Sequence, residues 1–399
     1  MRPARAAAIV AAIWLAGLGA AAQFGKASIL YDDLMARYGD VAGPAGVGLV
    51  VSIVGLVGLV FGTIAGIAVG RAGLSRTLVA ALWLAAGIAA LQVTLPPYPW
   101  MILLRVVEGM SHLAIVVAGP TLIAAITPQR LIGAAMTLWS SFFGVSYTLL
   151  ALLAPPVVTA FGAKGLILGH AAWFAIFALV LGVLLRGVAP PLHAASGQGG
   201  LWARHVAIYR SPRIAAPALG FVFYTILYVA LLTLVPPLLP DTMSRMAAVA
   251  MPALSILVSL TLGVWLLERI GPVRLVQAGF VLALCAAPVL AFPEPAPGLA
   301  LAGALVVSAG LGLVQGASFA TIPALNPDPA DRTLAAGAIA QMGNVGTVLG
   351  TPVLAALIAV FGPVALAGFA LPICAAGIAV HSWQARRRAR GEDAPIFGR

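Results

Sequence analysis

Long apolar runs separated by short polar breaks follow one another along the whole chain of 399 residues. Each run approaches or exceeds the roughly 20 residues that a helix needs to cross the hydrocarbon core of a bilayer. The runs are continuous, whereas the strands of a transmembrane barrel alternate apolar and polar positions. The pattern therefore predicts an all-α membrane protein with twelve transmembrane helices, at residues 6–29, 44–69, 75–95, 99–126, 131–154, 164–186, 214–238, 247–267, 273–292, 298–324, 333–356 and 362–384.

The amino-acid composition indicates that most of the protein surface contacts lipid and not water. Hydrophobic residues make up 62% of the sequence, charged residues 8%, and the mean hydropathy is +1.08. A soluble domain carries roughly 25% charged residues. Because the spans and their short loops use nearly the whole chain, no room is left for a separate soluble domain. The first run lacks a small-residue cleavage site, so we interpret it as a retained span and not as a signal peptide.

The formal net charge of +11 comes mainly from arginines in the short loops. In a soluble protein such a charge would suggest nucleic acid, but here its placement follows the positive-inside rule. With the N-terminus inside, seventeen of the 22 Lys and Arg residues fall on the cytoplasmic side. This predicts a multi-pass protein of a bacterial-type inner membrane with both termini in the cytoplasm, and no nucleic-acid partner.

The longest polar stretch, residues 187–213, divides the chain into two parts. It is rich in Gly, Pro and Ser at first, and then offers a short amphipathic segment at residues 201–209. Such a segment is typical of a helix that lies on the membrane surface. We therefore expect a six-helix bundle over residues 1–186, a cytoplasmic linker over 187–213, a second six-helix bundle over 214–385 and a basic tail over 386–399.

The two halves repeat each other at offsets of about 200 positions. A Gly- and Arg-containing loop follows span two at residues 70–76 and span eight at residues 268–274. Short polar pairs precede spans five and eleven at 129–130 and 331–332, and Glu108-Gly109 corresponds to Gln315-Gly316. Repeated parallel halves are related by an axis along the membrane normal in several transporter folds.

On these features the sequence resembles the major facilitator superfamily over its whole length. The family's loop after span two reads approximately G-x-x-x-D-R-x-G-R-R, and the chain matches its two glycines (Gly66 and Gly73) and one arginine (Arg71) but has Gly70 in place of the acid. The family's span-four motif R-x-x-Q-G appears here as Arg105-Val-Val-Glu108-Gly109. The resemblance implies twelve helices in two pseudo-symmetric bundles, with spans one, four, seven and ten around a central cavity.

Two readings of the cytoplasmic loop motifs remain open. Glycine permits a tight bend between helices, and arginines there can cap a helix or pair with an acid to hold one state closed. Alternatively the arginines only set topology. The residues concerned are Gly66, Arg71, Gly73 and Arg76 in the first copy and Glu268, Arg269, Gly271 and Arg274 in the second.

Ionisable residues inside the membrane are the candidates for function, because each costs roughly 2.5–3.5 kcal/mol or more at the bilayer centre. Arg105, Glu108 and His112 share one face of span four, since they are three and four positions apart. Glu108 and His112 lie near the middle of the roughly 30 Å core. They could bind a coupling proton, or they could form a structural network in which Arg105 neutralises Glu108.

Lys26 in span one allows several interpretations. It could extend to the membrane surface or pair with Asp32, it could join Arg105 as a second cation for an anionic substrate, or it could pair with Glu108 and leave the cavity nearly neutral. His170 in span six is expected to be structural. The resemblance places further polar residues at the cavity, namely Tyr224, Tyr228, Gln315 and Asn344.

These observations favour a secondary transporter that moves a small molecule, with an organic anion or another metabolite as the candidates, by alternating access with coupling to protons. No G-x-x-x-x-G-K-[ST] loop for ATP is present, and nothing indicates a cofactor, a metal site or an enzyme. We expect a monomer in the lipid bilayer. The alternatives are a drug or siderophore exporter of the same fold, and a sensor or assembly factor that uses the scaffold without transport.

Overall fold

The computed structural model describes residues 3–128, 131, 135, 138, 139, 141–188, 201–293 and 296–392, and all regular structure among them is helical. Eleven of the described helical segments are long and apolar enough to cross a membrane. The helices of the first half are α1 (Pro3–Ile29), α2 (Tyr31–Ser52), η1 (Ile53–Gly55), α3 (Leu56–Ala72), α4 (Leu74–Gln92), α5 (Tyr98–Ile126) and α7 (Phe142–Leu184). Those that follow are α8 (Leu201–Arg210), α9 (Ala215–Leu234), η3 (Pro236–Leu238), α10 (Asp241–Val258), η4 (Ser259–Gly263), α11 (Val264–Ile270), α12 (Pro272–Ala286), η5 (Ala287–Ala291), α13 (Pro297–Leu325), α14 (Pro329–Phe361) and α15 (Val364–Ala389).

Helix α7 accounts for two of the predicted spans. Its 43 residues are about twice the length that a bilayer requires. Gly162 interrupts it with φ 67° and ψ −177°, a conformation that only glycine adopts without strain. Counting α7 as two helices gives the twelve crossings that the apolar runs predict.

Glycines with positive φ mark equivalent turns in the two halves. Gly73 (φ 88°) separates α3 from α4, and Gly271 (φ 76°) separates α11 from α12. Gly162 (φ 67°) corresponds in the same way to Gly362 (φ 65°), which separates α14 from α15, and each of these follows a phenylalanine. The two pairs are about 200 positions apart, so the repeat seen in sequence extends to backbone conformation.

The chain forms two compact units, one comprising Met1–Val57 and Ile64–Ala195 and the other Gly58–Thr63 and Ser196–Arg399. In the first unit α1 packs against α7 and α5, and α4 packs against α5 and α7. Aliphatic and aromatic side chains of these four helices form its apolar core, among them Ile13, Leu82, Ile115, Leu122 and Phe174. This core lies beside the polar groups described below and fixes the helices that carry them.

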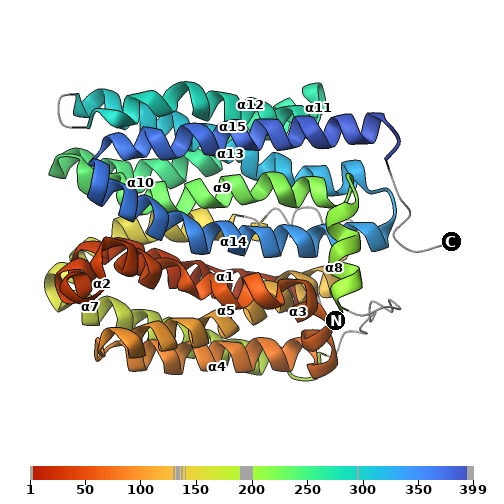
Figure 1. The fold of residues 1–399 in the computed structure, drawn as a ribbon. Coiled ribbons are helices and arrows are strands. Elements are labelled where there is room, and N and C mark those ends of the chain that lie inside the picture. The colour runs from red at the N-terminus through yellow and green to blue at the C-terminus, as the bar shows by residue number, and fades with distance from the viewer. Residues whose placement is uncertain are drawn as a thin grey trace. The chain divides into compact units, whose positions relative to one another are not determined.

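In the second unit α9 lies alongside α14 and also packs against α15 and α13 (Figure 1). The approach to α14 is close because glycines of α14 face α9. A methyl group on Gly346 would overlap the carbonyl oxygen of Val222, and one on Gly350 would overlap that of Ile226. The linker helix α8 is tied to this unit by Tyr209, whose hydroxyl donates to the side-chain oxygen of Gln341 at 2.9 Å.

Several helix ends differ from the sequence prediction. The fifth span was expected to end at residue 154, but α7 continues through Pro155 and Pro156 to the break at Gly162. Prolines are tolerated within membrane helices because other groups can satisfy the freed carbonyls. The eighth span begins at Asp241 and not at residue 247, since its first turns are helical although they are polar. The seventh span was expected to extend to residue 238, but α9 gives way at Pro236 and Pro237 to a 3₁₀ segment, so this pair of prolines ends the helix.

The close contact between α14 and α9 provides a test of the fold. We expect Gly350→Leu to lower the free energy of unfolding by about 1–3 kcal/mol or more, because the added side chain must displace backbone of α9. Thermal unfolding of the detergent-solubilised protein would measure the change. Gly368→Leu is the matched control, since a side chain there meets no atom within 4 Å. Equal destabilisation by both variants would contradict the packing argument.

Candidate functional site

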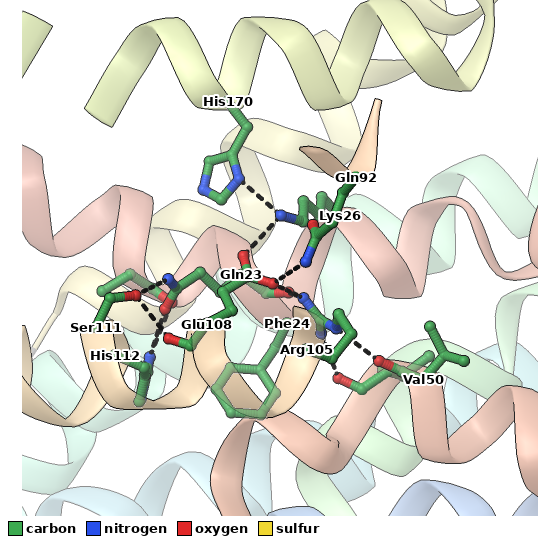
Figure 2. Close-up of polar contacts among 12 residues, drawn as sticks. Gln23, Phe24, Lys26, Val50, Gln92, Arg105, Glu108, Ser111, His112 and His170 are labelled. Atoms are coloured by element: carbon green, nitrogen blue, oxygen red, sulfur yellow. Dashed lines mark hydrogen bonds and ion pairs between the residues drawn. The ribbon is translucent and has the colours of Figure 1, made fainter. Parts of the chain in front are cut away.

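A single buried carboxylate, Glu108, lies at the centre of a polar network within the first unit (Figure 2). Its Oε1 accepts a hydrogen bond from Lys26 Nζ of α1 at 2.7 Å. Its Oε2 accepts from Arg105 Nη1 at 2.6 Å and from Gln92 Nε2 of α4 at 2.7 Å. Glu108 therefore forms ion pairs with two cations at once, and both of its oxygens are occupied.

Arg105 is fixed by backbone carbonyls as well as by Glu108. Its Nε and Nη2 donate to the oxygens of Val50 and Val51 at 2.8 Å each, and Nη1 also donates to the oxygen of Gln23 at 2.7 Å. Val50 and Val51 belong to the last turn of α2, where carbonyl groups run out of partners within their helix. The guanidinium thus caps α2 and is held in one orientation.

A second branch of the network joins α1 to α5 on the other side of Glu108. Gln23 Nε2 donates to Ser111 Oγ at 2.9 Å, and Ser111 Oγ donates to the Glu108 carbonyl at 2.6 Å. His112 Nδ1 lies 3.1 Å from the Ala20 oxygen and 3.0 Å from Gln23 Oε1. Both partners of that nitrogen are acceptors, so Nδ1 carries the proton. His112 therefore fixes Gln23 and does not touch the carboxylate.

His170 on the second part of α7 completes the surroundings of Lys26. Its Nδ1 lies 3.0 Å from Lys26 Nζ, and its Nε2 lies 2.9 Å from the Gly19 oxygen. An ammonium group can only donate, so Nδ1 accepts and Nε2 donates. The sequence predicted a structural role for His170 but did not indicate this contact with Lys26. Gln92 was missed as well, because nothing in its apolar stretch indicates that it turns toward Glu108.

The network is removed from solvent. Lys26 is 3% exposed, Arg105 1% and Glu108 0%. With all three groups ionised the cluster carries one positive charge more than negative. Removing one partner from a buried ion pair costs about 3–5 kcal/mol, because the other charge is left uncompensated. Of the interpretations of Lys26, its pairing with Glu108 is the one that the structure shows.

Glycine next to the carboxylate allows α5 to approach α2 and η1. A methyl group on Gly109 would overlap the carbonyl oxygen of Val54. The sequence repeat pairs Gly109 with Gly316 of α13, where an added Cβ would lie 2.6 Å from Ser259 Oγ at the start of η4, whereas the overlap with a backbone carbonyl occurs on α13 at Gly312, against the oxygen of Ser255. In the sequence repeat the half-buried neutral amide of Gln315 corresponds to Glu108. Both units thus use glycine for close contacts between helices, but only the first carries a charge at the paired position of the repeat.

The remaining cavity candidates lie on three helices of the second unit. Tyr224 and Tyr228 of α9 are buried and stack with ring centroids 5.0 Å apart. Asn344 of α14 is half-buried and donates to the Ala340 oxygen of its own helix at 2.8 Å. In the part of the chain that the structure describes, no hydrogen bond joins Tyr228, Gln315 and Asn344. These residues stay candidates for the cavity, without a common site in the structure.

The structure describes only some residues of the two cytoplasmic loop motifs. The side chain of Arg71 and the surroundings of Gly66 lie outside the described residues. Arg76 and Arg274 are exposed. Arg269 lies over the Trp265 ring at 3.7 Å and donates to the Trp265 oxygen at 2.9 Å, so it caps its own helix. Glu268 forms no ion pair among the described residues. The latch between halves therefore stays a prediction.

Comparison with solved structures places this fold among membrane transporters. The chain superposes on an inward-facing, occupied bacterial homologue of the human lysosomal transporter Spinster with a TM-score of 0.74, at 13% identity and over 99% of both chains. The nucleoside transporter NupG gives 0.70 at 14% identity over 95% of this chain and 99% of that one. The Escherichia coli fucose:proton symporter FucP gives 0.67 at 12% identity over 95% and 98%.

Twelve apolar crossings, the repeated halves and these similarities define a multi-pass membrane protein with the fold of secondary transporters. The sequence profile of the Major Facilitator Superfamily matches residues 8–328. The chain belongs to this superfamily. A search of curated protein sequences gave no match.

The shared carboxylate gives a stability test. We expect Glu108→Ala to lower the free energy of unfolding by about 3–5 kcal/mol, because Lys26 and Arg105 would remain buried without a counter-charge. Chemical unfolding in detergent would measure it, with Lys164→Ala at an exposed site as the control.

A double-mutant cycle separates pairing from packing in the same experiment. Lys26→Met should be less costly in the Glu108→Gln background than in the wild type, since the cation that lost its partner is then removed with it. Strictly additive effects of the two substitutions would contradict the ion-pair interpretation.

Proposed function

We propose that this chain is a proton-coupled secondary transporter of a small organic anion, in which Glu108 takes up the coupling proton. Lys26 and Arg105 would then hold the negative group of the substrate. The observation that supports this proposal is the sharing of one buried carboxylate by two buried cations. Alternating access would bring the cluster into contact with each side of the membrane in turn.

The charges of the cluster are the reason why we expect proton uptake by Glu108 to be coupled to the binding of an anion. Protonation of Glu108 would remove the only negative charge of the cluster and leave two cations without a counter-charge in a site from which water is excluded. Such a state is unfavourable by several kcal/mol unless another anion enters. A proton and an anionic group would therefore bind together, which is the requirement for symport.

Lys26 is the group that we expect to move when the proton arrives. Arg105 is held by three backbone carbonyls, whereas the Lys26 ammonium is held by Glu108 and His170 alone in its described contacts. Lysine also has a flexible four-carbon stem, while the guanidinium of arginine is planar and rigid. His170 would retain the ammonium near the site after Glu108 becomes neutral.

The comparisons support the class of function and leave the substrate open. One structural neighbour is described as a fucose:proton symporter and another as a nucleoside transporter, so the same fold serves unlike substrates. Identities of 12–14% show the fold alone. Our proposal of an anion depends on the charges of this chain, and not on the substrates of those proteins.

We also propose where the protein resides and how it is oriented in the membrane. The distribution of arginine favours a bacterial-type inner membrane with both termini in the cytoplasm. We propose that the protein acts as a monomer. Tyr224, Tyr228, Gln315 and Asn344 would complete the substrate cavity from the second half, as the family resemblance implies.

A screen of carboxylate and phosphate metabolites by thermal shift on the purified protein, at pH 6 and pH 8, tests this proposal. We expect certain anions to stabilise the wild type more strongly at pH 6, with apparent affinity changing by up to about tenfold per pH unit where Glu108 is ionised. Glu108→Gln imitates the neutral carboxyl, so it should bind the same anions without dependence on pH. Lys26→Ala and Arg105→Ala should lose the stabilisation.

Transport is then measured with the identified anion in proteoliposomes that contain a pH-sensitive dye. Wild-type uptake should bring protons into the vesicles and should fall when the pH gradient is collapsed. Glu108→Gln should exchange the anion across the membrane without proton movement. Stabilisation by cations alone would refute the anion proposal, and binding without any flux in the wild type would favour the sensor alternative.

A further inference from the structure

The last turns of α15 form a pocket that no part of the transport proposal uses. The pocket has a volume of about 370 Å³ and is lined by Trp383, Arg386, Arg387, Arg390 and Glu392. The first four lie at positions i, i+3, i+4 and i+7, so they share one face of the helix. Three arginines and one glutamate leave a net charge of +2 at this pocket.

The distance of the pocket residues from the start of α15 indicates that the pocket lies at the membrane surface. The helix starts at Val364 and is one of those apolar enough to cross a bilayer. About 20 residues are needed for a crossing, and that count from Val364 ends near Trp383. Trp383 is 49% exposed, as expected for a ring at the level of lipid headgroups. The arginines that follow therefore stand where lipid phosphates lie.

The arginines of the pocket differ in how far they are already engaged. Arg387 lies over the Trp383 ring at 5.1 Å, and it donates to Glu392 Oε2 at 2.9 Å and to the Arg210 oxygen at 3.0 Å. Arg387 is therefore held by protein groups and forms part of the pocket wall. Arg386 is exposed, and its side chain makes no polar contact among the described residues. Arg390 is 73% exposed, and its single described partner is Glu392, 3.9 Å away.

We propose that this pocket binds the phosphate headgroup of an anionic phospholipid, with Arg386 and Arg390 as its ligands and Trp383 against the upper acyl chain. Guanidinium groups suit phosphate because they offer paired donors in one plane. Arginines that only set topology would need neither a pocket nor an aromatic neighbour. Glu392 occupies one side of the pocket and opposes the binding of an anion.

Native mass spectrometry of the full-length protein tests the proposal, with phosphatidylglycerol and phosphatidylcholine as the two probes. The wild type should retain phosphatidylglycerol preferentially. The double variant Arg386→Gln/Arg390→Gln should bind it roughly thirty-fold more weakly, because each surface arginine contributes about fivefold to the affinity for anionic lipid. Glu392→Gln should strengthen binding, and Trp383→Leu should weaken binding of both lipids.

Arg186→Gln/Arg245→Gln is the matched control, since it removes two exposed arginines that lie outside the pocket. We expect this variant to bind phosphatidylglycerol as the wild type does. An equal loss in the control and pocket variants would refute a specific site, as would equal retention of the two lipids by the wild type. Displacement of the lipid by millimolar inorganic phosphate would assign the pocket to a soluble phosphate compound and overturn the lipid proposal. Thermal unfolding of every variant would show that each is folded.

Discussion

The ionised carboxylate of Glu108 has no water to solvate it, and the arrangement of the first unit follows from that constraint. Lys26 from α1, Gln92 from α4 and Arg105 from α5 supply its three donors. Arg105 in turn binds the end of α2, and Lys26 reaches α7 through His170. Five helices are therefore tied to one group in a region where the hydrophobic effect contributes little to helix association. A change in the charge of Glu108 therefore alters contacts that link all five helices.

The repeated halves keep the same backbone and differ in chemistry. Gly73 and Gly271 make equivalent turns, and Gly109 and Gly316, which the sequence repeat pairs, each stand close to a neighbouring helical segment. The position before the second pair is Glu108 in one half and Gln315 in the other. The second unit relies instead on close packing, with glycines of α14 against the backbone of α9. A duplicated scaffold can thus carry a charged group in one half and a neutral amide at the paired position of the other.

Arginines in this chain act according to the solvent around them. Arg105 has no access to water and is held by four hydrogen bonds, so it stabilises a fixed geometry. Arg269 lies at a helix end, where it stacks on Trp265 and caps a carbonyl. Arg386 and Arg390 extend from the end of α15 with few protein partners, which leaves them free for other ligands. The residue type is the same, but burial decides how many protein partners each side chain has.

The sequence by itself determined the membrane class, the twelve crossings and the two-fold repeat, and it singled out Arg105, Glu108 and His112 as candidates, because apolar run length and the rarity of charge are local properties. It could not determine which cation pairs with Glu108, since Lys26 is 82 positions away and Asp32 was equally available. Gln92 and His170 escaped prediction because nothing local shows which way a single polar residue in an apolar helix faces. Only tertiary packing decided that these side chains meet, since the rotation and the depth of each helix are set by its neighbours.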